Sequence, residues 1–263
     1  MRKYMVIYKV NLMSNLQYIA NIFVSSITYL LHIFIFIQIW NYIYEDPSEL
    51  INGYSKTQMM WYIVMTETIW CSVAGRRIVR EICNDVRSGN VAYNINKPYS
   101  YIGYILFYNL SESTLRGIVF STIGLSVGQI LIGSIPCLSI IEILAMIFTS
   151  ILAIIINLLF LTFVGLCAFI MEDSNPLYWI YSKIQLIFGI VFPIEFFPKV
   201  LQPIIKYSPV FVLCYGPAKL FINFNYNTFI TIVLAQILYI FISLGLCSLI
   251  YKKGVKKLNV NGG

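Results

Sequence analysis

The sequence predicts an all-α integral membrane protein with six transmembrane helices. Hydrophobic residues make up 59% of its 263 residues and charged residues only 11%, and a soluble fold of this size could not hide so much apolar surface from water. At roughly 20 residues per transmembrane helix, the apolar stretches accommodate six spans. Little sequence remains for a soluble module, so residues 1–263 are predicted to form a single transmembrane domain.

The N-terminal region is predicted to form an interfacial helix at residues 2–19, followed by a first span at residues 20–44. Met5, Tyr8 and Leu12 recur at helical spacing among polar residues, which is typical of an amphipathic helix in the plane of the interface. The apolar stretch that follows is too long for a signal peptide, and no small-residue cleavage site comes after it. We therefore expect a retained membrane anchor.

The other five spans are predicted where long apolar runs alternate with short polar loops. They lie at residues 57–75, 102–130, 142–171, 177–192 and 227–250. Charged residues near the middle of a span occur in the second span, at Glu67, and in the third, at Glu112 and Arg116.

These three charged residues are functional candidates because a charge in hydrocarbon is energetically costly. Glu112 and Arg116 are four residues apart, so they can pair on one face of a helix. One interpretation is a structural ion pair, with Glu67 either joining it or facing a water-filled path. Another is a charged lining of a substrate route, and a third is a proton relay.

Residues 76–100 form the most polar part of the chain, with five basic and two acidic residues. A helix is predicted from Arg77 to Arg87, ended by the stop signal Ser88-Gly89-Asn90. The segment is too long for a tight turn between two spans. We interpret it as a docking surface for a cytoplasmic partner, with a solvated, charged loop as the alternative.

Residues 193–217 contain five of the nine prolines of the chain but are still largely apolar. A straight helix cannot accommodate prolines at this density. Short, broken helices that dip into the outer leaflet are predicted instead, because irregular backbone at membrane depth is tolerated only where it packs against protein or lines a cavity.

The distribution of lysine and arginine predicts that both chain ends are cytoplasmic. With the N-terminus inside, the inside segments contain thirteen of these residues and the outside segments four, while Arg116 lies in a span. Such an excess marks the cytoplasmic side of membrane proteins. The net charge of +7 is therefore interpreted as a topology signal, with attraction to anionic membrane lipid as a second contribution, and no nucleic-acid partner is predicted.

Neither catalysis nor a bound cofactor is predicted for this chain. The metalloprotease motif HExxH and the phosphate-binding motif GxxxxGK[ST] are absent, so the chain is not expected to hydrolyse ATP by itself. His32 is the sole histidine, and without a companion cysteine or carboxylate cluster in the sequence it is interpreted as a packing or hydrogen-bonding residue. The six cysteines form no CxxC pattern, and no metal site is predicted.

Two motifs carry a resemblance to a known family. The first segment is Asp85-Val86-Arg87-Ser88-Gly89-Asn90-Val91, followed by Lys97-Pro98. The second segment is Gly189-Ile190-Val191-Phe192-Pro193-Ile194-Glu195-Phe196-Phe197-Pro198. The first is similar to an R-x-G-x-(aliphatic)…x-P pattern and the second to a G…P-x-x-x-(aromatic)-P signature. Together with the interfacial helix and six spans in this order, they resemble the membrane subunit of an ATP-binding-cassette exporter of the type-two permease family.

The resemblance implies a transport function that is powered by partner proteins. Two permease subunits pair as a homodimer or heterodimer, and two separate ATPase subunits, which bind ATP and Mg²⁺, dock beneath them. A coupling helix fits a groove on the ATPase, and broken helices cap the outer mouth. The implied coupling residues are Arg80, Glu81, Asp85, Arg87 and Gly89, and the implied outer-gate residues are Pro193, Glu195 and Pro198.

An ion- or proton-coupled carrier or channel is the alternative function. It would use Glu67, Glu112 and Arg116 along its route and need no ATPase. The bias toward Ile, Asn, Lys and Tyr suggests an AT-rich bacterial genome, so a bacterial cell membrane is the expected location. The sequence does not identify the transported substrate, because similar folds handle many substrates.

Overall fold

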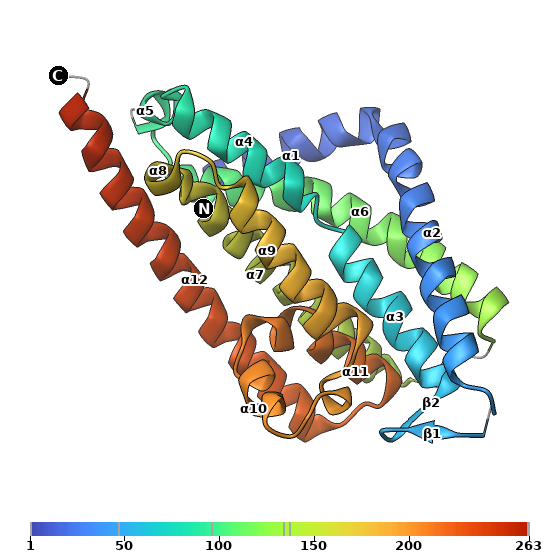
Figure 1. The fold of residues 1–263 in the computed structure, drawn as a ribbon. Helices are drawn as coiled ribbons and strands as arrows, with labels where there is room; N and C mark the ends of the chain where they lie inside the picture. The colour runs from blue at the N-terminus through green and yellow to red at the C-terminus, as the bar shows by residue number, and fades with distance from the viewer. Residues whose placement is uncertain (1, 47, 96, 134, 137, 262–263) are drawn as a thin grey trace.

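The computed structural model describes residues 2–46, 48–95, 97–133, 135–136 and 138–261, and most of them are helical (Figure 1). The first part of the chain forms α1 (Arg2–Gln17), α2 (Ile19–Ile43), β1 (Leu50–Ile51), β2 (Tyr54–Ser55), α3 (Lys56–Cys71), α4 (Gly75–Arg87), α5 (Asn90–Ile95) and α6 (Tyr101–Leu131). The second part forms α7 (Ile140–Leu166), α8 (Ala168–Met171), α9 (Asn175–Gln185), η1 (Leu186–Val191), η2 (Ile194–Phe196), α10 (Leu201–Lys206), η3 (Phe211–Tyr215), α11 (Gly216–Ile222) and α12 (Tyr226–Asn261).

Long helices connect two opposite ends of the molecule. The α4 end contains α1, α4, α5 and α8, and the hairpin end contains β1, β2, α10 and α11 (Figure 1). Helices α2, α6, α7 and α12 run between these ends, and α12 packs along α7. The start of α1 and the last turns of α12 both lie toward the α4 end (Figure 1).

Four helices among the described residues are long and apolar enough to cross a membrane, namely α2, α6, α7 continued by α8, and α12. The predicted second and fifth spans are shorter helices: α3 has 16 residues, and α9 has 11 residues before the six-residue π-helix η1. Every side chain of α3 from Met59 to Ile69 is buried. Helix α3 is therefore enclosed by other parts of the protein, and the enclosed side chains include the polar Thr66, Glu67 and Thr68.

Helix α1 forms where the sequence predicts it, but its predicted apolar stripe is not one contact face. Tyr8 Oη donates a hydrogen bond to Thr114 Oγ1 at 3.2 Å, and Asn11 Nδ2 donates to the Tyr108 carbonyl at 2.7 Å. Met5, in contrast, is exposed. The helix thus packs on α6 through polar and aromatic groups, because these find hydrogen-bond partners there, and leaves apolar side chains on its outer side.

The β-hairpin was not predicted from the sequence. Leu50 pairs with Ser55 and Ile51 with Tyr54 in an antiparallel arrangement. The two residues between the strands, Asn52 and Gly53, both have positive φ angles, of 51° and 84°. Asn-Gly is the preferred pair for such a turn, because its backbone twist matches that of the two strands.

Helix α4 confirms the helix predicted between Arg77 and Arg87, although it begins two residues earlier, at Gly75. Its apolar side chains share one buried face, formed by Ile78, Val79, Ile82, Cys83 and Val86. The predicted stop is also confirmed, since Gly89 has a φ of 72°, a left-handed conformation that favours glycine. Because α3 already ends at Cys71, the second predicted span is shorter than residues 57–75.

The proline-rich stretch is broken into short helices, as the sequence predicts. The elements η2, α10 and η3 have three to six residues each, and α11 has seven. Pro193 immediately precedes η2, and Pro217 lies in α11 just after η3, where the two elements form one helical run, Phe211–Ile222. The last helix, α12, continues through residues 251–261, well past the predicted end at residue 250.

Two apolar cores lie at the two ends of the molecule. The larger core joins α2, α3, η3 and α11 toward the hairpin end, and the smaller joins α4, α6 and α7 toward the α4 end. Buried polar side chains occur between them, including Glu67, Glu112, Asn157 and Gln185. The functional residues predicted for the membrane interior therefore lie in a polar layer between two apolar cores.

Candidate functional site

A cavity of about 810 Å³ opens in the half of the molecule toward the α4 end. It is lined by residues of α2, α3, α4, α6, α7 and α9, including His32, Cys71, Arg116, Asn157 and Gln185. The exposed polar residues of α4 line its wall as well. Polar side chains from six helices therefore face one shared space, which is the strongest candidate for a binding or transport site.

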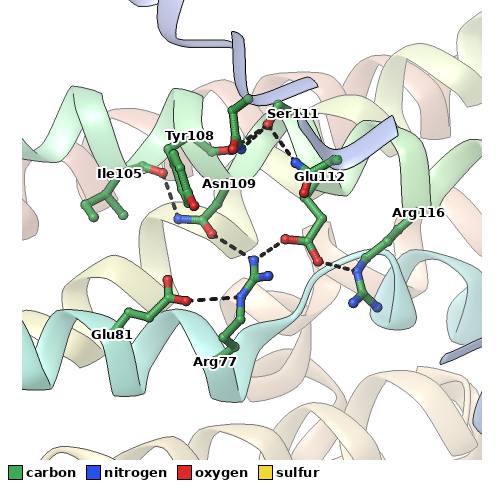
Figure 2. A network of polar contacts seen from close by, with 10 residues as sticks. Arg77, Glu81, Ile105, Tyr108, Asn109, Ser111, Glu112 and Arg116 are labelled. Carbon is green, nitrogen blue, oxygen red and sulfur yellow. Dashed lines mark hydrogen bonds and ion pairs between the residues drawn. The ribbon is translucent and has the colours of Figure 1, made fainter. Parts of the chain in front are cut away.

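A network of charged side chains ties α4 to α6 beside this cavity (Figure 2). Arg116 Nε donates to Glu112 Oε1 at 2.7 Å, and the Arg77 guanidinium contacts the other carboxylate oxygen of Glu112. Arg77 also reaches Glu81, with 3.4 Å between Nε and Oε1, and Asn109 Oδ1, at 3.4 Å. Glu112 is thus held between two arginines, one from each helix.

Glu67 belongs to a different group of side chains. It is 1% exposed, and its Oε2 lies 3.3 Å from His32 Nδ1 and 3.6 Å from Cys71 Sγ. The structure brings these residues together from α2 and α3. In the sequence His32 has no companion carboxylate or cysteine nearby, because both partners lie more than thirty residues downstream.

The five residues predicted for coupling divide into two sets. Arg80 and Glu81 are exposed, and partial burial raises the pKa of Glu81 even though Arg77 lies beside it. Asp85 accepts a hydrogen bond from Tyr101 Oη at 2.9 Å, and Gly89 ends the helical segment. Asp85 therefore anchors α4 within the protein, whereas Arg80 and Glu81 are accessible.

The fifth coupling candidate, Arg87, is exposed but not free of contacts. Its Nε donates to the Glu172 carbonyl at 2.6 Å, and its Nη2 lies 3.6 Å from Asp173 Oδ2. Hydrogen bonds from the backbone and side chain of Asn175 lower the pKa of Asp173, and Arg87 adds to this effect. Arg87 thus ties α4 to the loop between α8 and α9.

A second polar cluster lies at the hairpin end and contains the predicted gate residue Glu195. Tyr215 Oη donates to Glu195 Oε1 at 2.6 Å, and Tyr54 Oη donates to Oε2 at 2.8 Å. Lys219 Nζ donates to Tyr54 Oη at 2.6 Å and lies 3.1 Å from Glu195 Oε1. Burial would raise the pKa of Glu195, but the hydrogen bonds and the Lys219 charge lower it below its ordinary value.

The other two predicted gate residues shape the backbone around this cluster. Pro193 has an extended ψ of 155° and its carbonyl accepts a hydrogen bond from the Phe196 N–H at 3.0 Å. The Pro198 carbonyl accepts from the N–H of Leu201 at 2.8 Å. These turns carry Glu195 toward Tyr54 and Lys219. Neither contact is apparent from the sequence, because Tyr54 lies 141 residues and Lys219 24 residues from Glu195 in the chain.

One motif match in α6 carries no catalytic role. Gly124-Leu125-Ser126-Val127-Gly128 fits the pattern GxSxG, but a nucleophile elbow of that kind requires a sharp turn between a strand and a helix. Here the motif lies inside a continuous helix, and Ser126 Oγ donates to the Thr122 carbonyl at 2.8 Å. The serine is therefore not presented as a nucleophile.

Long apolar helices, a polar cavity and a basic amphipathic helix are features expected of a membrane protein of the transporter-permease class. A family model described as ABC-2 family transporter protein matches residues 27–262, and the chain belongs to this family. No curated protein matches the chain. Membership makes it a membrane component of an ABC transporter rather than a catalytic enzyme, in agreement with the resemblance found in the sequence.

Proposed function

We propose that this chain is the permease half of an ABC exporter, in which two permeases form the translocation path and separate ATPase subunits supply the energy. Membership in the ABC-2 family carries this proposal. In this assignment α3 and α9 with η1 act as the second and fifth of six spans, shielded from lipid by their neighbours or by the second permease. ATP and Mg²⁺ bind to the partner ATPase and not to this chain.

The proposed orientation places the α4 end and both chain ends in the cytoplasm of a bacterial cell. The lysine and arginine excess supports this orientation, because positive residues accumulate on the cytoplasmic side. Lys252, Lys253 and Lys256 lie in the last turns of α12, toward the same end as α4. Helix α1 then lies at the inner interface, where exposed Met5 and Val10 contact lipid.

Helix α4 is proposed as the coupling helix. Among the described residues, Arg76 and Arg80 have no carboxylate within 4.0 Å, and both side chains are exposed. Buried apolar residues fix the opposite face of α4 to the protein. The helix therefore presents positive charge on a rigid support, which suits docking to a complementary acidic groove.

The cavity is proposed as this subunit's half of the path. It lies next to α4, so movement of α4 by an ATPase would change the positions of the Arg77 and Arg116 side chains that line the cavity. At the hairpin end, the Glu195 cluster joins η2, β2 and α11 and is proposed to close the outer mouth. Substrate would enter near α4 and leave near the hairpin.

The docking proposal can be tested with a pair of charge reversals at the two ends. Tagged chain is purified from its native membranes, and the co-purified ATPase is quantified per permease. Arg80→Glu should reduce the recovered ATPase by about tenfold, equivalent to about 1.4 kcal/mol of binding free energy. Lys199→Glu, which reverses an exposed charge at the hairpin end, should leave recovery unchanged. Equal recovery for both variants would rule out docking through α4.

An ion- or proton-coupled carrier is the alternative. The observation that favours it is Glu67, a carboxylate buried without a lysine or arginine within 4.0 Å among the described residues. Glu112 and Arg116 weigh against it, because both already participate in the ion-pair network with Arg77. Transport in vesicles that stops on ATP depletion supports the exporter, whereas transport that follows only the proton gradient supports the carrier.

A further inference from the structure

Three side chains with metal-binding atoms meet at the wall of the cavity. His32 Nδ1, a carboxylate oxygen of Glu67 and Cys71 Sγ all lie within 4.8 Å of one another. Glu67 and Cys71 are four residues apart on α3, which places them on the same helix face, and His32 faces them from α2. The three atoms come from the two rigid helices and not from a loop.

Their spacing fits a tetrahedral zinc site. Zn²⁺ binds histidine nitrogen and carboxylate oxygen at about 2.0–2.2 Å and thiolate sulfur at about 2.3 Å, so tetrahedral ligands lie about 3.3–3.6 Å apart. The nitrogen of His32 and the sulfur of Cys71 lie 3.3 Å and 3.6 Å from Glu67 Oε2. Two of the three ligand separations therefore need almost no adjustment.

The charges also balance. Glu67 is buried, and among the described residues no lysine or arginine lies within 4.0 Å of it. A carboxylate and a thiolate together neutralise a divalent cation, and a neutral group is far less costly in a low-dielectric interior than a single charge. Arg116, which lines the same cavity, shares Glu112 with Arg77, and Glu81 supplies the second negative charge of this network, so the charge of Arg116 is balanced there.

The site is accessible from the cavity. His32 and Cys71 both line it, and 44% of the His32 side chain is exposed. Three protein ligands with a fourth position open to solvent is the arrangement of zinc sites that exchange a water molecule or a ligand, whereas closed structural sites use four protein ligands. Glu67, at 1% exposure, forms the buried back of the site.

We propose that His32, Glu67 and Cys71 bind one Zn²⁺ ion that connects α2 to α3 and has an open coordination position facing the cavity. On binding, the Cys71 thiol releases its proton to water, and the thiolate, the carboxylate and the neutral imidazole donate to the metal. This assignment concerns the residues of this chain alone and does not depend on the partner ATPase or on the direction of transport.

The test uses the purified full-length chain in detergent, first stripped of metal and then titrated with Co²⁺ alone and with Zn²⁺ alone. Bound Co²⁺ should show the visible bands of tetrahedral coordination and a near-ultraviolet thiolate charge-transfer band, and Zn²⁺ should displace it at one ion per chain. Cys71→Ala should abolish the charge-transfer band, and Glu67→Gln should weaken Zn²⁺ affinity by at least about tenfold. Cys214→Ala removes a buried cysteine outside the cluster and should leave both signals intact.

Stability measurements separate metal binding from misfolding. Saturating Zn²⁺ should raise the melting temperature of the native chain and of Cys214→Ala, because a ligand that binds only the folded state stabilises it. It should not raise that of Cys71→Ala, whose metal-free melting temperature serves as the folding control. Absence of a charge-transfer band in the native chain, or equal Zn²⁺ affinity in the Cys71→Ala and Cys214→Ala variants, would overturn the proposal.

Discussion

The two ends of the molecule hold a carboxylate in different ways: Glu112 is buried, whereas the Glu195 side chain is partly exposed. At the α4 end, Glu112 lies between two arginines, and the helices that carry these residues, α4 and α6, are continuous over 13 and 31 residues. At the hairpin end, Glu195 receives hydrogen bonds from two tyrosines and a lysine, and its partners come from a two-residue strand and short helices. The Glu112 network joins helices that apolar packing already keeps together. The Glu195 cluster joins segments that are too short to be stable on their own.

The two ends also differ in how much charge is left without an opposite charge beside it. The Glu195 cluster contains one carboxylate and one ammonium group, and each member bonds to another member. At the α4 end, α4 alone has four arginines against two acidic residues, so positive charge is left over on its exposed face. We infer that the hairpin end is organised for internal closure and the α4 end for contact with a partner.

The largest loss of folding stability is expected when the charge of Glu112 is removed. Glu112→Gln leaves two arginines without their shared anion, and the expected loss of stability is about 3 kcal/mol, since removing one partner of a buried ion pair leaves an uncompensated charge. Unfolding in detergent, followed by circular dichroism, measures it. The exposed Glu49→Gln is the matched control and should change stability by less than about 0.5 kcal/mol. Similar values for the two variants would show that the network contributes nothing.

Neutralising Glu195 should have a smaller and pH-dependent effect. Glu195→Gln is expected to lose about 1.5 kcal/mol, because hydrogen bonds to a charged group are weakened. The pKa of Glu195 is lowered from 4.5 in the fold, so its ionisation stabilises the protein above that pH, and this contribution is lost as pH falls through the lowered value. The stability difference between native chain and variant should therefore shrink below about pH 4.5; a constant difference would contradict this role.

Replacing the glycine that ends the α4–α5 turn should have a moderate effect. Gly89 has a φ of 72° and no atom near an added Cβ, so Gly89→Ala should lose about 1 kcal/mol from backbone conformation alone. Gly245 lies within α12 and also has space for a Cβ, so Gly245→Ala should not destabilise. Equal melting temperatures for the two alanine variants would contradict the conformational argument.

The smallest change in stability is expected for the arginines of α4, and it distinguishes Arg87, which has a structural role, from Arg80, which is proposed to dock the ATPase. Arg87→Ala removes contacts with the α8–α9 loop and should lower stability by about 0.5 kcal/mol, the usual value for an exposed ion pair. Arg80→Ala should leave stability unchanged but weaken ATPase recovery. If Arg80→Ala proves the more destabilising of the two, Arg80 has a structural role and the division proposed for α4 is wrong.

Local features were predictable from the sequence, and distant contacts were not. The Glu112–Arg116 contact follows from a spacing of four residues on one helix, and the end of α4 follows from one glycine. The partners of Glu195 were missed because Tyr54 is 141 residues away in the chain. Arg77 was visible as a basic residue, but its contact with Glu112 spans 35 residues and depends on how α4 packs against α6.

The sequence by itself determined that this chain is a helical membrane protein of the ABC-2 family, and it located most helices and the polar segment that contains α4. Composition and periodicity carry this information because each reflects the surroundings of a residue and its near neighbours. Only the tertiary structure decided which charges meet. His32, Glu67 and Cys71 form a cluster because α2 packs against α3, and helix packing depends on side chains along the full length of both helices.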